Sequence, residues 1–206
     1  CTGMDLPVTK TDQSTSRKLL HEAMSLHRAG RLDEAGRRYA AFLELEPQHA
    51  QALRLCGALR REQGDAEGAL SLLQQARAAA PEDAEAAAEL GLCHLAAGEL
   101  LPAERVLRAA VQLAPEHGRA LANLGALLQY RGHVDAAIDC HRRVLALDPD
   151  DIEVRCNLIN TLLEAGRGDE ALAESDAALK GWPGRALLLV ARGAVLTGIE
   201  RYDEAV

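Results

Sequence analysis

A period of 34 residues runs through this sequence, and it limits the possible folds more than any other feature does. Prolines recur at this spacing at Pro47, Pro81, Pro115, Pro149 and Pro183. Glycines recur with the same period at Gly30, Gly64, Gly98, Gly132 and Gly166. A unit of this length buries its apolar face only by stacking on its neighbours. The period therefore predicts a stack of short repeated units without a single globular core.

The central copy, residues 118–151, indicates what each unit contains. Four of its residues follow the i, i+3, i+4, i+7 spacing of one helix face: Leu121, Leu124, Gly125 and Leu128. Gly132 ends this helix, because glycine takes the left-handed conformation without steric strain. A second apolar stripe over 136–147 ends at Pro149, which cannot continue a helix. Each copy is therefore predicted to be a hairpin of two helices.

The pattern resembles the tetratricopeptide repeat family, whose 34-residue unit carries large residues around Leu-Gly, then an alanine, another large residue and a proline. The best match is Leu121, Leu124, Gly125, Leu128, Ala137, His141 and Pro149. Departures include Arg155 at the place of the usual tryptophan, and Ala23 and Ile159 at the place of the glycine. The resemblance implies an all-α fold, a right-handed superhelical solenoid of antiparallel helix hairpins with five complete repeats and a partial sixth.

The repeats are expected at 16–49, 50–83, 84–117, 118–151, 152–185 and, in part, 186–206, forming one elongated domain over 16–206. Residues 1–15 carry no helical stripe and are expected to form a flexible leader, with a residue among 14–16 capping the first helix. The chain begins at Cys1 and ends inside the sixth hairpin, so a fragment is expected. The alternative that Cys1 is a lipidated N-terminus stays open.

The composition argues against several classes of function. With 31 acidic and 23 basic residues the net charge is −8, and only 2% of residues are aromatic, so neither a basic stripe nor a stacking platform for nucleic acid is expected. There is no apolar run of about 18 residues to span a membrane, and no secretory segment. A cytoplasmic protein without nucleic-acid or membrane partners is expected. The oligomeric state is not indicated.

Groups for catalysis or metal binding are also not expected. The five cysteines form no CxxC pair, which favours free thiols over a zinc site or disulfide framework. Cys93 precedes His94 and Cys140 precedes His141, but adjacent helix residues point about 100° apart and cannot form a nucleophile–base contact. No catalytic residue, metal or cofactor is therefore predicted for the chain.

The resemblance places ligand binding in a concave groove lined by the first helix of each hairpin. Carried onto this sequence, the groove positions give six candidate peptide-binding residues: Arg54, Arg119, Asn123, Tyr130, Asn157 and Asn160. Asn123 and Asn157 lie 34 residues apart, and an amide can both donate to and accept from a peptide backbone. The pair is similar to the asparagine ladder in the repeats of O-linked N-acetylglucosamine transferases. The alternative is that both are solvated side chains.

Other repeats lack this asparagine, and one of them has Glu89 there, an acid that would repel a bound carboxylate. A clamp for the C-terminal carboxylate of a peptide, known in the family, is therefore not favoured. The preferred function is a non-catalytic scaffold that binds an extended segment or a helix of a partner protein in the groove. The alternative is the substrate-recruiting arm of a larger bacterial enzyme, a glycosyltransferase, sulfotransferase or 2-oxoglutarate-dependent oxygenase, with its catalytic domain beyond residue 206.

Overall fold

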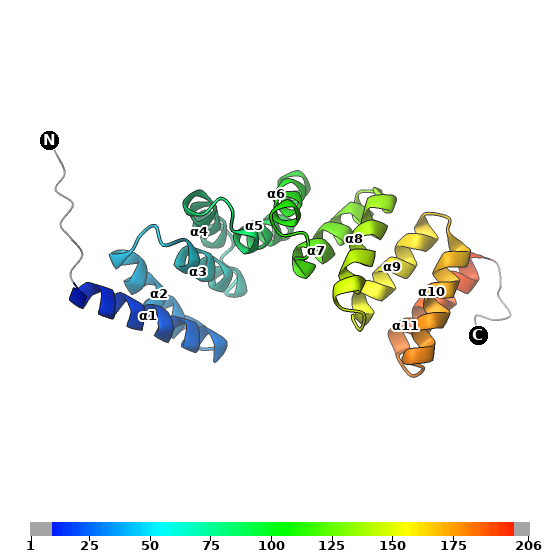
Figure 1. The fold of residues 1–206 in the computed structure, drawn as a ribbon, viewed down its shortest axis with the longest axis horizontal. Coiled ribbons are helices and arrows are strands. Elements are labelled where there is room, and N and C mark those ends of the chain that lie inside the picture. The colour runs from blue at the N-terminus through cyan, green and yellow to red at the C-terminus, as the bar shows by residue number, and fades with distance from the viewer. Residues whose placement is uncertain (1–9, 200–206) are drawn as a thin grey trace. The chain divides into compact units, whose positions relative to one another are not determined.

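The computed structural model describes residues 10–199, and these residues form eleven α-helices and no strand (Figure 1). The helices are α1 (Lys10–Arg28), α2 (Leu32–Leu45), α3 (Ala50–Glu62), α4 (Ala66–Ala79), α5 (Ala84–Ala96), α6 (Leu100–Leu113), α7 (Gly118–Tyr130), α8 (Val134–Leu147), α9 (Ile152–Glu164), α10 (Gly168–Gly181) and α11 (Ala186–Gly198). Successive helices pack in pairs, as α1 does with α2, α3 with α4 and α7 with α8. The predicted all-α fold of repeated helix hairpins is confirmed.

The chain divides into two compact units, with the boundary between Val106 and Leu107 inside α6. The first unit has a core of small and large apolar side chains that includes Ala23, Tyr39, Cys56 and Leu59. The core of the second unit gathers residues from α8 to α11, among them Ile138, Leu158, Ile159, Leu162 and Leu188. Leucine and alanine therefore supply most of the burial in both units, joined by isoleucine in the second, as the scarcity of aromatic residues implies. The assignment of all repeats to one domain stays a prediction.

The first helix begins earlier than the sequence indicates. Helix α1 starts at Lys10, so residues 10–15 are helical and the expected leader over 1–15 is too long. No glycine or proline separates Lys10 from the apolar stripe, and a helix fixed by packing extends into such a segment at little cost. Ser16 lies inside the helix and is buried, so it does not cap it. Residues 1–9, which include Cys1, and residues 200–206, which end the expected partial sixth repeat, lie outside the described residues.

The turn of each of the first five hairpins is closed by a glycine that follows the first helix. After α7, the Gly132 N–H donates to the Gln129 carbonyl over 2.9 Å, and the His133 N–H donates to the Leu128 carbonyl over 2.8 Å. This pair of bonds satisfies two carbonyls at the helix end and requires a left-handed residue, which Gly132 supplies with φ of 77°. The four equivalent glycines also have positive φ, so the prediction that glycine ends each first helix is confirmed.

The turns between hairpins use side chains to cap the next first helix. Asp83 accepts the Ala86 N–H at 3.0 Å, and Asp151 accepts the Val154 N–H at 2.9 Å. His49 does the same at α3, where its Nδ1 accepts the Ala52 N–H at 3.2 Å. The capping nitrogen must be unprotonated, so the proton of the neutral His49 ring lies on Nε2. His117 caps α7 in the same way through Nδ1.

Within a hairpin, a small residue on the first helix faces a larger one on the second. A Cβ added to Gly57 would lie 2.7 Å from Leu73 Cγ, and a Cβ added to Gly125 would lie 2.8 Å from His141 Cε1. These contacts explain the glycine at this position in the second and fourth repeats. The fifth repeat reverses the sizes, because Ile159 stands at the glycine position and Ser175 at that of His141, 34 residues earlier. Both Ile159 and Ser175 are fully buried.

Candidate functional site

The six predicted groove residues lie on three of the first helices. Helix α3 of the first unit carries Arg54, whereas α7 and α9 of the second unit carry the other five: Arg119, Asn123, Tyr130, Asn157 and Asn160. Helices α7 and α9 pack against each other. The structure therefore places five of the six residues on two adjacent helices, and Arg54 belongs to a separate unit. Each unit has its own candidate surface.

In the second unit the asparagine side chains keep hydrogen-bonding capacity. The Asn123 Nδ2 donates to the Arg119 carbonyl one turn earlier over 2.8 Å, which uses one of its two N–H groups and leaves its oxygen as an acceptor. Asn157 is half-buried, and its side-chain amide makes no hydrogen bond with the side chains of 14–199 or with the described backbone. Asn160 is exposed. These amides are able to pair with the backbone of an added chain.

A polar link joins the C-terminal ends of adjacent first helices in both units. Gln129 Nε2 donates to Glu164 Oε1 over 2.9 Å, between α7 and α9. His27 Nε2 lies 3.1 Å from Glu62 Oε2, between α1 and α3. Both pairs are 35 residues apart. Neither pair was predicted from the sequence. The spacing could have indicated them, because in each pair the acid stands one repeat and one position after the polar residue that it contacts.

Tyr130 stands beside this link at the end of α7. Its side chain is 78% exposed, which makes it the most exposed of the large hydrophobic residues among those described. A tyrosine in this state offers a flat apolar face and a hydroxyl to a partner without loss of a buried contact. The role of Tyr130 in binding stays a prediction.

In the first unit the groove charges pair with each other. Arg61 Nε lies 3.3 Å from Glu89 Oε2, and Glu89 is only 4% exposed. Arg54 Nε lies 3.4 Å from Asp83 Oδ2, the carboxylate that also caps α5, without donating a hydrogen bond to it. The view of Glu89 as an acid that repels ligand is wrong, since its carboxylate is buried and paired with Arg61. Sequence spacing alone does not reveal this pairing.

A buried tyrosine extends the first polar link into the core. The Tyr39 hydroxyl lies 3.4 Å from His27 Nδ1, so Tyr39, His27 and Glu62 form a chain of polar contacts. Burial of Tyr39 raises the pKa of its phenol to about 12. The phenol is therefore protonated at neutral pH. The chain ties two hairpins together and does not supply a nucleophile.

The four cysteines of the described part are free thiols, three of them buried. Burial raises the pKa of each thiol above its usual value, so the reactive thiolate is disfavoured. Their histidine neighbours are engaged elsewhere or enclosed: His94 Nδ1 lies 2.6 Å from Glu99 Oε2, and both ring nitrogens of His141 are buried without a hydrogen bond. Neither adjacent pair forms a nucleophile–base contact.

Among the side chains that the structure describes, 14–199, no group of three or more histidine, cysteine or acidic residues is arranged to hold a metal ion. In the same part of the chain, no helix has both the length and the apolar character that crossing a bilayer requires.

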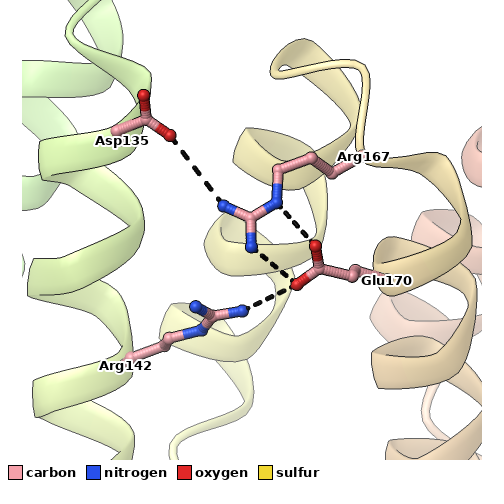
Figure 2. A network of polar contacts seen from close by, with 4 residues as sticks. All are labelled: Asp135, Arg142, Arg167 and Glu170. Carbon is pink, nitrogen blue, oxygen red and sulfur yellow. Dashed lines mark hydrogen bonds and ion pairs between the residues drawn. The ribbon is translucent and has the colours of Figure 1, made fainter.

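The second helices carry a separate polar cluster, which links α8 to the start of α10 (Figure 2). Arg167 donates two hydrogen bonds of 2.7 Å to Glu170, and Arg142 donates a third of 2.9 Å. Asp135 lies 3.9 Å from Arg167. The hydrogen bond from Arg167 lowers the pKa of Glu170 most strongly. All these charges are satisfied at an exposed surface, so the cluster connects two hairpins and is not a candidate binding site.

Comparison with known families and structures is consistent with this geometry. A family model described as tetratricopeptide repeat matches residues 60–128 and 130–192, more than half of the chain, and a second model with the same description matches 20–70. No curated protein matches the chain in sequence.

Several solved structures share the fold. A tetratricopeptide repeat protein from Parabacteroides merdae superposes with a TM-score of 0.78 at 18% identity, covering 93% of this chain and 76% of that one. Pseudomonas aeruginosa pilF gives 0.79 at 19% identity, covering 95% and 89%. YrrB, described as a tetratricopeptide repeat protein with an unusual peptide-binding site, gives 0.71 at 24% identity, covering 84% and 90%.

Proposed function

The chain belongs to the tetratricopeptide repeat family, whose members are protein-interaction scaffolds, and on that premise we propose that it binds an extended peptide segment of a partner protein along α7 and α9. The observation that carries the proposal is the pair Asn123 and Asn157. They occupy the same position of consecutive repeats, on two helices that pack together. An amide at each step can accept from and donate to a peptide backbone regardless of the peptide sequence.

The surroundings of these amides support an extended ligand. Asn160 lies one turn beyond Asn157 on the same helix and is exposed, and Tyr130 offers an exposed aromatic face at the end of α7. Arg119 lies one turn before Asn123 and adds a positive charge at the other end of α7. A peptide that lies across α7 and α9 would contact amides at its centre and side-chain groups at its edges. Arg54 of the first unit is a second, independent candidate.

The test uses a peptide selected from a randomised display library on the wild-type protein. Labelled with fluorescein, it would be titrated with wild type and with Asn123→Ala/Asn157→Ala, and Kd would be read by fluorescence polarisation. Two lost amide contacts of about 1 kcal/mol each should weaken binding roughly 30-fold. The matched control is Asp139→Ala/Arg142→Ala on α8, which should leave Kd unchanged. Equal affinities of the wild type and the asparagine variant would refute the role of the two amides.

The alternative function, a substrate-recruiting arm of a larger enzyme, uses the same surface and makes the same peptide prediction. The two proposals are distinguished by what the reading frame encodes after residue 206. A folded domain without the 34-residue period after Val206 would favour the recruiting arm, whereas further repeats ending in a polar capping helix would favour the scaffold.

A further inference from the structure

The carbonyl oxygens of three prolines between hairpins each accept a hydrogen bond from an arginine. The pairs are Arg77 with Pro81, Arg143 with Pro115, and Arg155 with Pro149. The last two bonds measure 2.9 Å and 2.6 Å. Each proline follows the end of a second helix, where carbonyl groups lack helical partners and the helix dipole is negative. A guanidinium suits this place because it supplies both positive charge and N–H donors.

Each of the three arginines lies on a helix that stands in a different place relative to the proline it contacts: the helix before the proline, the first helix after it, or the second helix after it. Arg77 comes from α4, the helix that the proline follows. Arg143 comes from α8, the second helix of the next hairpin, and Arg155 comes from α9, the first helix of the next hairpin. The repeat does not dictate any single arginine, yet a guanidinium lies at this carbonyl in three consecutive turns. The turn itself is therefore a favourable site for a guanidinium.

The first turn, at Pro47, is different. The positions equivalent to the three arginines hold Leu43, Gln75 and Leu53. Among the described residues of the first unit, no arginine donates to the Pro47 carbonyl, and Gln75 donates instead to the Ser71 hydroxyl over 3.3 Å. The turn at Pro183 is left out of this comparison, because one of the equivalent positions falls after α11, outside the described residues.

A surface cavity of about 270 Å³ lies at the first turn. Its lining residues are Pro47, Gln48, Leu53, Gln75, Ala78 and Ala79. Two of the three positions that hold an arginine at other turns thus form walls of this cavity. We call it the Pro47 cavity.

We propose that the Pro47 cavity binds an arginine side chain of a partner protein. Leu53, Ala78 and Ala79 give apolar walls against which the methylene stem can pack. The Pro47 carbonyl, at the negative end of α2, accepts the guanidinium N–H groups. Glu46 does not line this cavity, but it is half-buried in the same turn and borders an adjoining hollow together with Pro47 and Gln48, so its carboxylate adds negative charge near the site. The site is distinct from the groove, because none of its lining residues is among the six predicted groove residues.

The chemistry favours arginine over other side chains. A guanidinium presents several N–H donors in one plane, whereas a lysine ammonium is a compact and strongly hydrated charge. Citrulline has nearly the same shape as arginine but no charge, and its ureido group interacts only weakly with a helix C-terminus. The order of affinity should be arginine, then lysine, then citrulline.

The experiment follows backbone amide signals by NMR while the protein is titrated with N-acetyl-arginine-N-methylamide. Saturable shifts should concentrate at Gln48, Ala78 and Ala79. The lysine compound should bind roughly threefold or more weakly, and the citrulline compound should cause little shift at the same residues. Equal shifts from the arginine and citrulline compounds, or shifts spread over the whole protein, would overturn the proposal.

A variant supplies the missing arginine from the protein itself. Gln75→Arg copies the arrangement of Arg143 and should fill the cavity, weakening the binding of the arginine compound roughly tenfold. Gln74→Arg adds the same charge at the neighbouring exposed position and should bind like wild type. Full binding by Gln75→Arg would contradict the assignment. Should that variant fail to fold, the comparison of arginine with citrulline on wild type still decides, and the Asn123→Ala/Asn157→Ala variant should bind the compound normally.

Discussion

The groove faces of the two units differ in what they do with the same repeat position. In the third repeat, on α5 of the first unit, that position holds Glu89, whose carboxylate is buried against Arg61. In the second unit it holds Asn123 and then Asn157, whose amides remain able to bond further. The repeat therefore determines the place of this side chain on the helix, but it does not determine whether the side chain joins two hairpins or remains able to bind a partner. One copy uses the position to join hairpins, and the next two can present it to a partner.

The largest effect should come from removing the buried acid. Glu89→Ala leaves Arg61 partly buried without its carboxylate, and we expect a loss of about 2 kcal/mol in the free energy of unfolding. The estimate lies below the range for fully buried pairs because the Arg61 side chain is 31% exposed. Asn123→Ala, at the same position one repeat later, should change stability by less than about 0.5 kcal/mol. Urea denaturation of both variants measures the comparison.

A second control lies within the first unit itself. Glu62→Ala removes an acid that also contacts the preceding repeat but is 43% exposed, so its loss should stay under about 1 kcal/mol. If Glu89→Ala were as mild as Glu62→Ala, the distinction between a supporting and a presenting position would fail.

A smaller effect concerns the close approach of the two helices in the fourth repeat. In Gly125→Ala the new methyl would lie 2.8 Å from His141 Cε1 and 3.1 Å from Cys140 Cβ, so the hairpin must open slightly. Overpacking costs about 1–3 kcal/mol, and the better helix propensity of alanine offsets about 1 kcal/mol of it. We expect a net loss of about 1 kcal/mol.

Gly118→Ala in the same helix is the matched control, because the nearest atom to its Cβ is 3.9 Å away. Thermal unfolding should show a lower midpoint for Gly125→Ala only. Equal midpoints for the two variants would mean that the contact with His141 is not tight in solution.

Most of the architecture could be predicted because it depends on local chemistry repeated at a fixed period. Gly132 has to be left-handed, and Pro149 has to follow a helix end, whatever the partner of the hairpin. The start of α1 was misplaced because residues 10–15 lack an apolar stripe, yet a helix extends through them from the packed turns that follow. The role of His49 as a cap was also not expected, since histidine is not a typical cap residue.

The candidate site was less predictable because its properties depend on contacts between repeats. The residue types at Asn123 and Asn157 pointed to a polar face from spacing alone, and their helices do pack together. The pairing of Glu89 with Arg61 joins residues 28 apart, a separation that the 34-residue period does not suggest. The exchange of sizes at Ile159 and Ser175 likewise becomes visible only when facing helices are compared.

The smallest expected effect is a difference between the two units in how their stability changes at acidic pH. Both ring nitrogens of His141 are buried without a hydrogen-bond partner, and the α3–α4 hairpin of the first unit has leucine at the matching position, Leu73. Burial alone lowers the pKa of His141 below its usual value of about 6.5. Below about pH 6.5 the His141 ring binds a proton in the unfolded chain, whereas the folded chain keeps the ring neutral. The folded state is therefore fully stabilised above about pH 6.5, and this stabilisation is lost as the pH falls toward the lowered pKa.

Hydrogen exchange read separately for α7–α8 and α3–α4 measures this difference. Between pH 7.5 and 5.5, once corrected for intrinsic exchange rates, protection should fall in α7–α8 and change less in α3–α4. His141→Leu, which copies Leu73, should remove the extra pH dependence of α7–α8, since no ring remains to be protonated there. If that variant kept the full acid response, the sensitivity would have to arise from another group. His141 packs beside Gly125 on α7, the helix that carries Asn123. Its protonation as the pH falls would therefore loosen the candidate surface of the second unit at a higher pH than that of the first unit.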